Sequence, residues 1–280
     1  MADKPSLRRR SKAALLELKP LLDRINNEVE QPDYIPEDPV QFMHSFHQKE
    51  DQEIAGFLAA TMAWGRRDIV VSKVDELLSR MHYKPHDFVC SYSQSDFSVL
   101  KGFKHRTFKP IDIHGLILTL QEIYRRYPDF ESFWEECYDA GKRQSRPFLG
   151  VFNERFFMMS PDLAERTRKH VSNPENGSPC KRLYMFLRWT IRKQSPVDPG
   201  IWSFMPPSEL KIPLDVHVAR QGRKFGLITR RSNDWKTVNE LTETLSLLNP
   251  EDPARYDYAL FGIGALNYSL PLRFHLNRVD

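Results

Sequence analysis

Apolar side chains recur at helical spacing along almost the whole of this 280-residue chain, and no stretch alternates apolar and polar residues as a half-buried strand would. Twelve Gly stand against 18 Phe, 10 Tyr and 5 Trp, which favours packed helices over a sheet protein rich in tight turns. The same balance argues against a nucleotide-binding α/β fold. The sequence therefore predicts an all-α protein, a multi-helix globule with two lobes.

The individual helices can be placed from the apolar stripes and from the residues that begin or end them. They are expected over residues 12–30, 53–64, 70–81, 113–126, 130–140, 151–159, 162–170 and 181–192, with three more toward the end of the chain. Asp112, Asp215, Asp234 and Asp252 are suited to N-cap positions. Gly141 is expected to stop a helix. The Pro-rich, acidic stretch 31–39 predicts an N-terminal helical arm, 1–39, ahead of a second region, 40–280.

The net charge limits the classes of partner that this chain can have, and the cysteine content indicates its cellular compartment. Forty-one Lys and Arg against 37 Asp and Glu give a formal net charge of +4, which permits a polyanionic partner without requiring one. Three widely spaced Cys predict free thiols in the cytoplasm, and no zinc or iron-sulfur site, so neither a metal nor a cofactor is expected. No run of about 20 apolar residues or secretory leader is found, and we expect no membrane contact. The cluster Arg8, Arg9 and Arg10 is interpreted as a solvated leader, with contact to a phosphate or an acidic surface as the alternative.

Lys181 is the first candidate for chemistry. It follows a Gly-containing turn, Asn176 to Pro179, and opens an amphipathic helix. The free N–H groups at a helix start attract phosphate, while their partial positive charge disfavours an ammonium and favours the nucleophilic amine. An ordinary surface lysine lying over its own helix is the plainer interpretation of the same pattern.

Two further candidates come from helix ends. Asp215 in the segment IPLDVHVAR can be held ionised by the N–H groups of a helix start, although a capping role alone explains it equally. Trp64, Arg66 and Arg67 follow a buried helix, where an aromatic ring and guanidinium groups can stack a base or clamp a phosphate. They would also suit a packed helix end.

Taken together, the segments NGSPCKRLYMFLRW, LDVHVARQGRKFGL and PARYDYALFGIG resemble the helix-hairpin-helix DNA glycosylase superfamily. The upstream segment FLAATMAWGRRDIVVSKVDELL looks like the early buried helix and pocket turn of that superfamily. The resemblance covers roughly residues 50 to 265 and centres on a hairpin and catalytic segment, 171–227. Lys181 and Asp215 are 34 positions apart, which is similar to the archaeal-type 8-oxoguanine DNA glycosylases. The amino-acid sequences of the segments CKRLYMFLRW and IPLDVHVAR also look like those of an uncharacterised bacterial family of conserved hypothetical proteins. We interpret that family as a divergent arm of this superfamily.

The resemblance implies base-excision DNA repair by a bifunctional DNA glycosylase and abasic-site lyase. The partner of a monomer would be duplex DNA with a damaged base, for which an oxidised purine is one candidate, and the damaged nucleotide would be flipped into a cleft between lobes. Lys181 would attack the deoxyribose C1′, and Asp215 would stabilise the positive charge that develops there. The hairpin residues and nearby cations expected to contact DNA are Gly177, Ser178, Arg182 and Arg220. The expected base pocket consists of Trp64, Arg66, Arg67, Arg188, Trp189 and Trp202.

The chain departs from the superfamily pattern at two places. Pro179 stands where the hairpin usually has its second glycine, which removes one N–H donor from the expected phosphate site. The stretch AWGRR replaces the usual glutamine-containing pocket turn, so the lesion cannot be read from it. A non-catalytic nucleic-acid-binding module of the same scaffold, and a helical interaction protein without nucleic-acid function, therefore stay open as alternatives.

Overall fold

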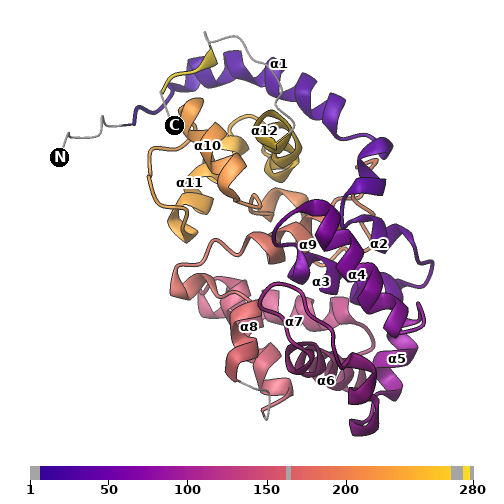
Figure 1. Cartoon of the computed structure of the whole chain (residues 1–280). Helices are drawn as coiled ribbons and strands as arrows, with labels where there is room; N and C mark the ends of the chain where they lie inside the picture. Colours follow the sequence, from indigo (N-terminus) through magenta and orange to yellow (C-terminus); the bar gives the residue numbers. More distant parts are fainter. Residues whose placement is uncertain (1–6, 162–164, 266–273, 278–280) are drawn as a thin grey trace, which may run out of the picture. The chain divides into compact units, whose positions relative to one another are not determined.

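A computed structural model describes residues 7–161, 165–265 and 274–277, and helices dominate these residues (Figure 1). The described residues contain no strand, and their β-type pairing is an isolated bridge between His105 and Phe108. The predicted all-α fold is therefore confirmed.

The chain divides into two compact units. Unit 1 comprises Met1–Pro32, Gly177–Arg188 and Pro206–Asp280, and unit 2 comprises Asp33–Asn176 and Trp189–Met205. The division falls inside helix α9 (Lys181–Ile191). Each unit is described by itself.

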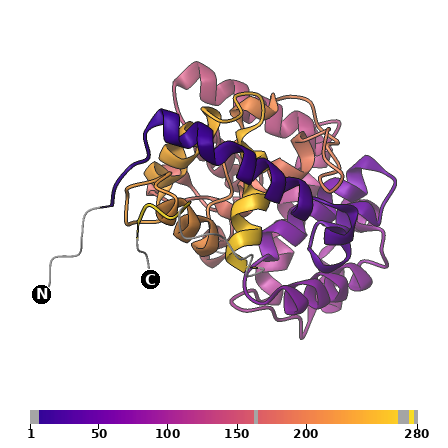
Figure 2. The ribbon, with the colours of Figure 1, turned by 90° about the horizontal axis from the view of Figure 1, so that it is seen from above.

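Unit 1 joins the N-terminal helix to the C-terminal part of the chain. Besides the start of α9, it contains α1 (Lys12–Val29), η5 (Pro207–Glu209), α10 (Val216–Lys224), α11 (Trp235–Ser246), η6 (Pro253–Arg255) and α12 (Tyr256–Ala265). α1 packs on α12, as Figure 2 shows for the indigo and yellow helices. Gly262 permits this approach, because a Cβ there would lie 2.7 Å from Cγ2 of Val29. Close packing of this helix pair therefore requires glycine at position 262.

Unit 2 is a larger group of helices around an aromatic core. Its elements are η1 (Pro32–Glu37), α2 (Gln41–His44), α3 (Lys49–Met62), α4 (Arg67–Arg80), α5 (Pro85–Ser91), η2 (Gln94–Leu100), α6 (Pro110–Arg126), α7 (Phe130–Gln144), α8 (Phe148–Met159), η3 (Glu165–His170) and η4 (Pro174–Asn176). α7 and α8 pack through stacked rings of Trp134 and Phe152, whose centroids are 3.8 Å apart. Aromatic side chains of this size contribute strongly to core stability because they bury large apolar areas.

Two helix boundaries differ from the sequence prediction. α6 begins at Pro110, whose fixed φ suits the first helical position, so Asp112 occupies the third position and not the N-cap. There it accepts the N–H of Lys109 at 2.8 Å. Gly141 does not end α7, because a Cβ at this position would lie 2.7 Å from Cβ of Phe148, and glycine lets α8 pack closely. α7 instead ends at Gln144, and the next residue, Ser145, adopts a left-handed conformation.

The arginine cluster before α1 is held against unit 1, contrary to the predicted solvated leader. The Arg10 side chain donates to the carbonyl oxygens of Phe225 at 2.9 Å and Phe274 at 2.6 Å. Arg9 donates to Oγ1 of Thr244 at 3.0 Å. The last carbonyls of a helix lack partners within it, and Phe225 follows α10 directly, so a guanidinium satisfies an acceptor that would otherwise need water.

The structure also tests the predictions for the cysteines, for the helix over residues 162–170 and for membrane-spanning helices. Cys90, Cys137 and Cys180 are free thiols, as predicted. Of the helix expected over 162–170, Glu165–His170 forms η3, while residues 162–164 lie outside the described residues. No helix in the described part of the chain is long and apolar enough to cross a membrane.

Candidate functional site

The turn that precedes α9 is left-handed at its glycine. Gly177 has φ of +78°, a conformation that favours glycine, and no atom within 4 Å would obstruct a side chain there. Its carbonyl oxygen accepts the N–H of Trp235 at 3.0 Å, which ties the turn to α11. Ser178 accepts the N–H of Cys180 through its hydroxyl at 3.3 Å. The turn predicted from the sequence is therefore present, with Gly177 exposed and Ser178 half-buried.

Lys181 is the first residue of α9 and is half-buried directly behind this turn. Its Nζ lies 3.5 Å from Sδ of Met185, one helical turn further on. Among the described residues it has no carboxylate within ion-pairing distance. A thioether sulfur is a weak acceptor, so this contact leaves the Lys181 amine with hydrogen-bonding capacity.

Asp215 is the N-cap of α10, as predicted. Its Oδ1 accepts the N–H of Val218 at 2.8 Å, and the backbone of Asp215 is extended. Its Oδ2 makes no hydrogen bond within the described residues, and the next residue, Val216, is 67% exposed. The carboxylate is half-buried and keeps one oxygen available for a further partner.

The side chains of α10 beyond Asp215 turn toward α12. Nδ1 of His217 lies 3.1 Å from the carbonyl oxygen of Gly264, and Arg220 donates to the same oxygen at 3.3 Å. A Cβ at Gly264 would lie 2.8 Å from Cβ of His217, so this contact also depends on glycine. Arg220, predicted to contact DNA, is thus half-buried and packs on the end of α12.

The two arginines of α9 differ from each other in setting. Arg182 is half-buried, and burial lowers the pKa of its guanidinium. Arg188 is only 3% exposed and pairs with Asp257, while its Nη2 donates to the Tyr258 hydroxyl at 3.0 Å. Its guanidinium carbon also lies 4.0 Å from the centroid of the Tyr258 ring. Arg188, predicted to line a base pocket, holds α9 to α12 inside unit 1.

The predicted pocket turn between α3 and α4 belongs to unit 2. Trp64 is 49% exposed, and the Arg106 guanidinium lies 5.4 Å from its ring centroid and donates to its carbonyl oxygen at 3.2 Å. The side chain of Arg66 is 79% exposed and binds Asp68 through two hydrogen bonds. Arg67 donates to the Tyr34 hydroxyl at 3.1 Å. The Trp64 indole is therefore about half exposed, with the guanidinium of Arg106 near its ring.

The other two predicted pocket tryptophans are fully buried. Trp189 and Trp202 have no exposed surface, and Nε1 of Trp202 donates to Oε1 of Glu53 at 2.7 Å. Their rings present no open face to a base in this arrangement.

Glu53 is a polar centre that the sequence analysis did not single out. It is fully buried in α3 and accepts from Trp202, from the Tyr124 hydroxyl at 2.8 Å, and from the N–H groups of Phe130 at 3.1 Å and Glu131 at 3.2 Å. Burial raises the pKa of the Glu53 carboxyl to about 7, against the opposing effect of these donors. The available signal was a carboxylate in a helix segment that is otherwise apolar on all sides.

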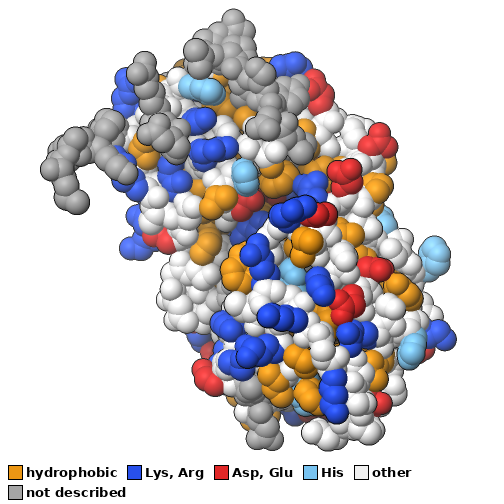
Figure 3. All heavy atoms as spheres, in the orientation of Figure 1, with side chains coloured by type: hydrophobic (Ala, Val, Ile, Leu, Met, Phe, Trp, Pro, Cys, Tyr) orange, Lys and Arg blue, Asp and Glu red, His pale blue; other side chains and the backbone are white. Residues whose placement is uncertain are grey.

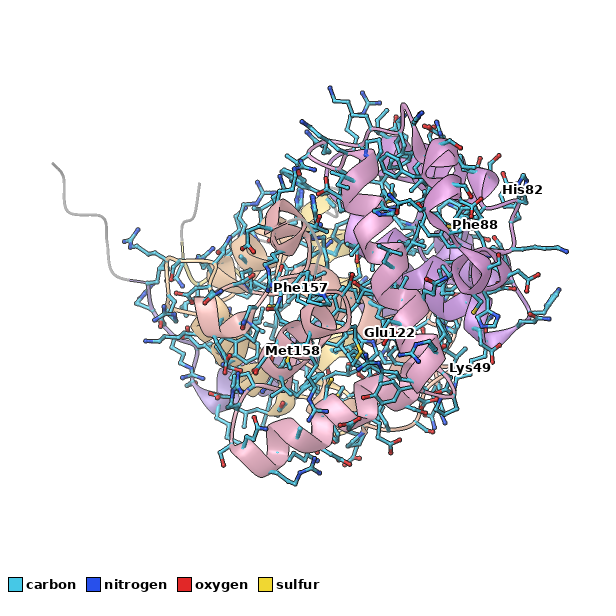
Figure 4. All side chains as sticks on the ribbon, turned by 90° about the horizontal axis from the view of Figure 1, so that it is seen from below. Lys49, His82, Phe88, Glu122, Phe157 and Met158 are labelled. Atoms are coloured by element: carbon cyan, nitrogen blue, oxygen red, sulfur yellow. The ribbon has the colours of Figure 1, made fainter. Side chains whose placement is uncertain are left out.

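Lys49 completes this polar centre at the surface of unit 2 (Figure 4). Its ammonium lies 2.7 Å from Asp129, 2.6 Å from Glu131 and 3.9 Å from Glu53. Asp129 in turn caps α7 by accepting the N–H of Ser132 at 2.8 Å. Glu53 and Asp129 together satisfy the first three N–H groups of α7, so this cluster builds the helix start and is occupied by its own partners.

Positive charge is concentrated in unit 1 around the α9 and α10 segments. From Gly177 to Arg188 there are three Lys and Arg and no acid, and from Val216 to Lys236 there are six and one acid. This excess is larger than the +4 of the whole chain, so the remaining residues are net acidic. Figure 3 shows one face of the molecule, on which Lys and Arg side chains predominate over Asp and Glu. Among the described residues, no group of three or more His, Cys, Asp or Glu is arranged to hold a metal ion.

Comparisons with known proteins give one match. A model of the family described as a protein of unknown function (DUF2400) matches residues 38–266, well over half of the chain. No curated protein and no solved structure matches the sequence. The likeness to helix-hairpin-helix DNA glycosylases stays a prediction from the sequence motifs.

Proposed function

The chain belongs to the DUF2400 family, and we propose that it acts in base-excision DNA repair as a bifunctional DNA glycosylase and abasic-site lyase. The observation that carries this proposal is the setting of Lys181. A half-buried amine opens a helix behind a left-handed glycine turn, has no carboxylate partner among the described residues, and shares unit 1 with a capping aspartate that keeps one oxygen available. These are the features that an amine nucleophile and its stabilising carboxylate require.

In the proposed reaction the neutral amine of Lys181 attacks C1′ of the flipped nucleotide. The glycosidic C1′–N bond breaks, and its electron pair leaves with the base, which takes up a proton. The C1′–O4′ bond then breaks, O4′ takes up a proton, and an iminium forms between Nζ and C1′. Transfer of a C2′ proton to water breaks the C3′–O bond and releases the 3′ phosphate with its electron pair. Water hydrolyses the iminium and releases the amine. The Asp215 carboxylate stabilises the positive charge at C1′ and accepts the proton that the lysine loses.

Substrate binding would begin with the DNA backbone. The Gly177 turn is exposed, and the segments around it carry the positive excess of the chain, which supports binding of a polyanion. A damaged base leaves the stack more easily than a paired normal base. An oxidised purine is the proposed lesion, because the 34-residue spacing between Lys181 and Asp215 resembles that of the archaeal-type 8-oxoguanine DNA glycosylases.

Borohydride trapping tests the proposal. Intact protein, incubated with a duplex that holds an abasic site or 8-oxoguanine and then reduced, should give a covalent protein–DNA adduct. Lys181→Ala should give none while keeping the helical circular dichroism spectrum of the parent. Lys12→Ala is the matched control, because Lys12 is also the first residue of a helix in unit 1, and this variant should be trapped normally.

Undiminished trapping of Lys181→Ala would remove this lysine from the mechanism. Salt-sensitive DNA binding by the parent chain without any adduct would favour the non-catalytic module, for which the positive excess of the α9 and α10 segments is the supporting observation.

A further inference from the structure

The connection between α10 and α11, residues 225–234, is organised by one buried guanidinium. Arg223 is 9% exposed and donates to the carbonyl oxygens of Arg230 at 2.7 Å, Arg231 at 2.9 Å and Ser232 at 3.0 Å. It also donates to Oδ1 of Asn233 at 2.6 Å. A planar guanidinium that serves four consecutive residues fixes the path of their backbone, so this connection is held in one shape.

The same connection is joined to the turn before α9. The N–H of Trp235 donates to the carbonyl oxygen of Gly177 at 3.0 Å. The Trp235 ring stacks on Tyr184 of α9, with centroids 5.9 Å apart and planes 9° from parallel. Within unit 1, the glycine turn and the α10–α11 connection therefore form one continuous piece of surface.

The charged side chains of this piece of surface are mostly cationic. Arg231 and Lys236 are exposed. The acid among them, Asp234, is already engaged, because it lies 2.5 Å from Nη2 of Arg230 and accepts the N–H of Thr237 at 2.9 Å. The outward charge of the connection is therefore positive, on a backbone that Arg223 holds in place.

We propose that the α10–α11 connection is a second contact to the DNA backbone, in which Arg231 and Lys236 bind phosphates next to those bound at the Gly177 turn. The inference rests on the proposed function, since it takes duplex DNA as the partner. Its physical basis is charge complementarity, because the exposed residues Arg231 and Lys236 are cationic and lie on or next to a backbone whose path Arg223 fixes. Such contacts position the duplex and carry no sequence preference.

Fluorescence anisotropy with a labelled duplex that holds one tetrahydrofuran abasic analogue tests this contact. The double variant Arg231→Gln, Lys236→Gln should bind about tenfold more weakly, and its dependence of log affinity on log salt should be shallower by about 2. The control Lys12→Gln, Arg24→Gln removes the same charge from α1 of unit 1 and should keep the parent affinity and salt slope.

Parent affinity and slope in the Arg231, Lys236 variant would overturn the inference and leave the proposed function intact, because DNA would still bind elsewhere. Equal losses in the test and control variants would also overturn it, since the effect would then be one of net charge. Absence of binding by the parent chain would overturn both proposals, and borohydride trapping then reports separately on the chemistry of Lys181.

Discussion

A carboxylate caps the start of α10 in unit 1, and carboxylates also cap the start of α7 in unit 2, but the two settings differ in how many partners they offer. Asp215 is half-buried, accepts a single N–H group within the described residues and leaves Oδ2 without a partner there. Glu53 is fully buried and receives four donors, with Lys49 nearby. The difference separates a carboxylate whose hydrogen-bonding capacity is used up by the fold from one that retains capacity for a substrate.

This contrast explains why a buried acid with a raised pKa is not automatically the functional one. The pKa of Glu53 is raised to about 7 because burial outweighs its donors, a property often found in catalytic acids. Its oxygens nevertheless face only groups of unit 2. We therefore assign Glu53 to the stability of α7, while Asp215 stays the carboxylate proposed for the chemistry, and the following substitutions test that division.

The largest expected effect on stability is that of Glu53→Ala. It leaves the Trp202 indole N–H, the Tyr124 hydroxyl and the N–H groups of Phe130 and Glu131 buried without their acceptor. We expect a loss of about 3–5 kcal/mol in the free energy of unfolding, measured by urea denaturation. Asp215→Ala, which removes a single cap, should cost about 1 kcal/mol. Equal losses in the two variants would break the distinction between the two carboxylates.

Asp215→Asn tests whether the Asp215 carboxylate does more than cap α10. Asparagine caps a helix about as well as aspartate, so the free energy of unfolding should change by less than about 0.5 kcal/mol. The charge that stabilises C1′ is lost, and single-turnover cleavage of an 8-oxoguanine duplex should slow by about 10²–10³-fold. Undiminished cleavage in a stably folded variant would mean that Asp215 is only a cap.

The pH dependence of stability gives a smaller and graded effect. Because the pKa of Glu53 is raised from 4.5 to about 7 in the folded chain, the native state keeps a proton that the unfolded state has already released in this range. The free energy of unfolding should therefore fall as pH rises from about 5 to 7, by up to about 3 kcal/mol from this group. Glu53→Gln should flatten the profile relative to the parent, whereas parallel profiles would contradict the assignment.

Features determined by local sequence were predicted well. Of the four predicted N-caps, Asp215 and Asp234 accept the N–H three residues ahead, because capping depends mainly on neighbouring residues. Asp112 lies at the third position of α6, and Asp252 precedes η6 without a capping side-chain hydrogen bond. The position of Lys181 at the start of α9 follows from the same local logic, since the preceding turn needs glycine and proline. Apolar periodicity sufficed for the fold class because many helices, such as α1 and α7, bury one apolar stripe, while α3 and α12 are apolar and buried on nearly all sides.

Features that depend on distant partners could not be predicted. The sequence does not indicate that Asp112 accepts a hydrogen bond from the hydroxyl of Thr167, 55 positions away. Nor does it indicate that Arg10 donates to the carbonyl oxygen of Phe225. Arg188 was placed in a base pocket because its buried partner, Asp257, lies 69 positions further on. A single arginine looks the same in a sequence whether it ends in solvent, on a phosphate or on a buried carboxylate.

Peptide mapping of the borohydride-reduced adduct tests the central claim most directly. The parent protein, trapped on an abasic duplex and digested, should carry the sugar-derived mass on Nζ of Lys181, in the peptide that includes KRLYMFLRW. A modification located instead on Lys236, Lys224 or the N-terminal amine would show that the Schiff base forms elsewhere, and would contradict the assignment of Lys181 as the nucleophile.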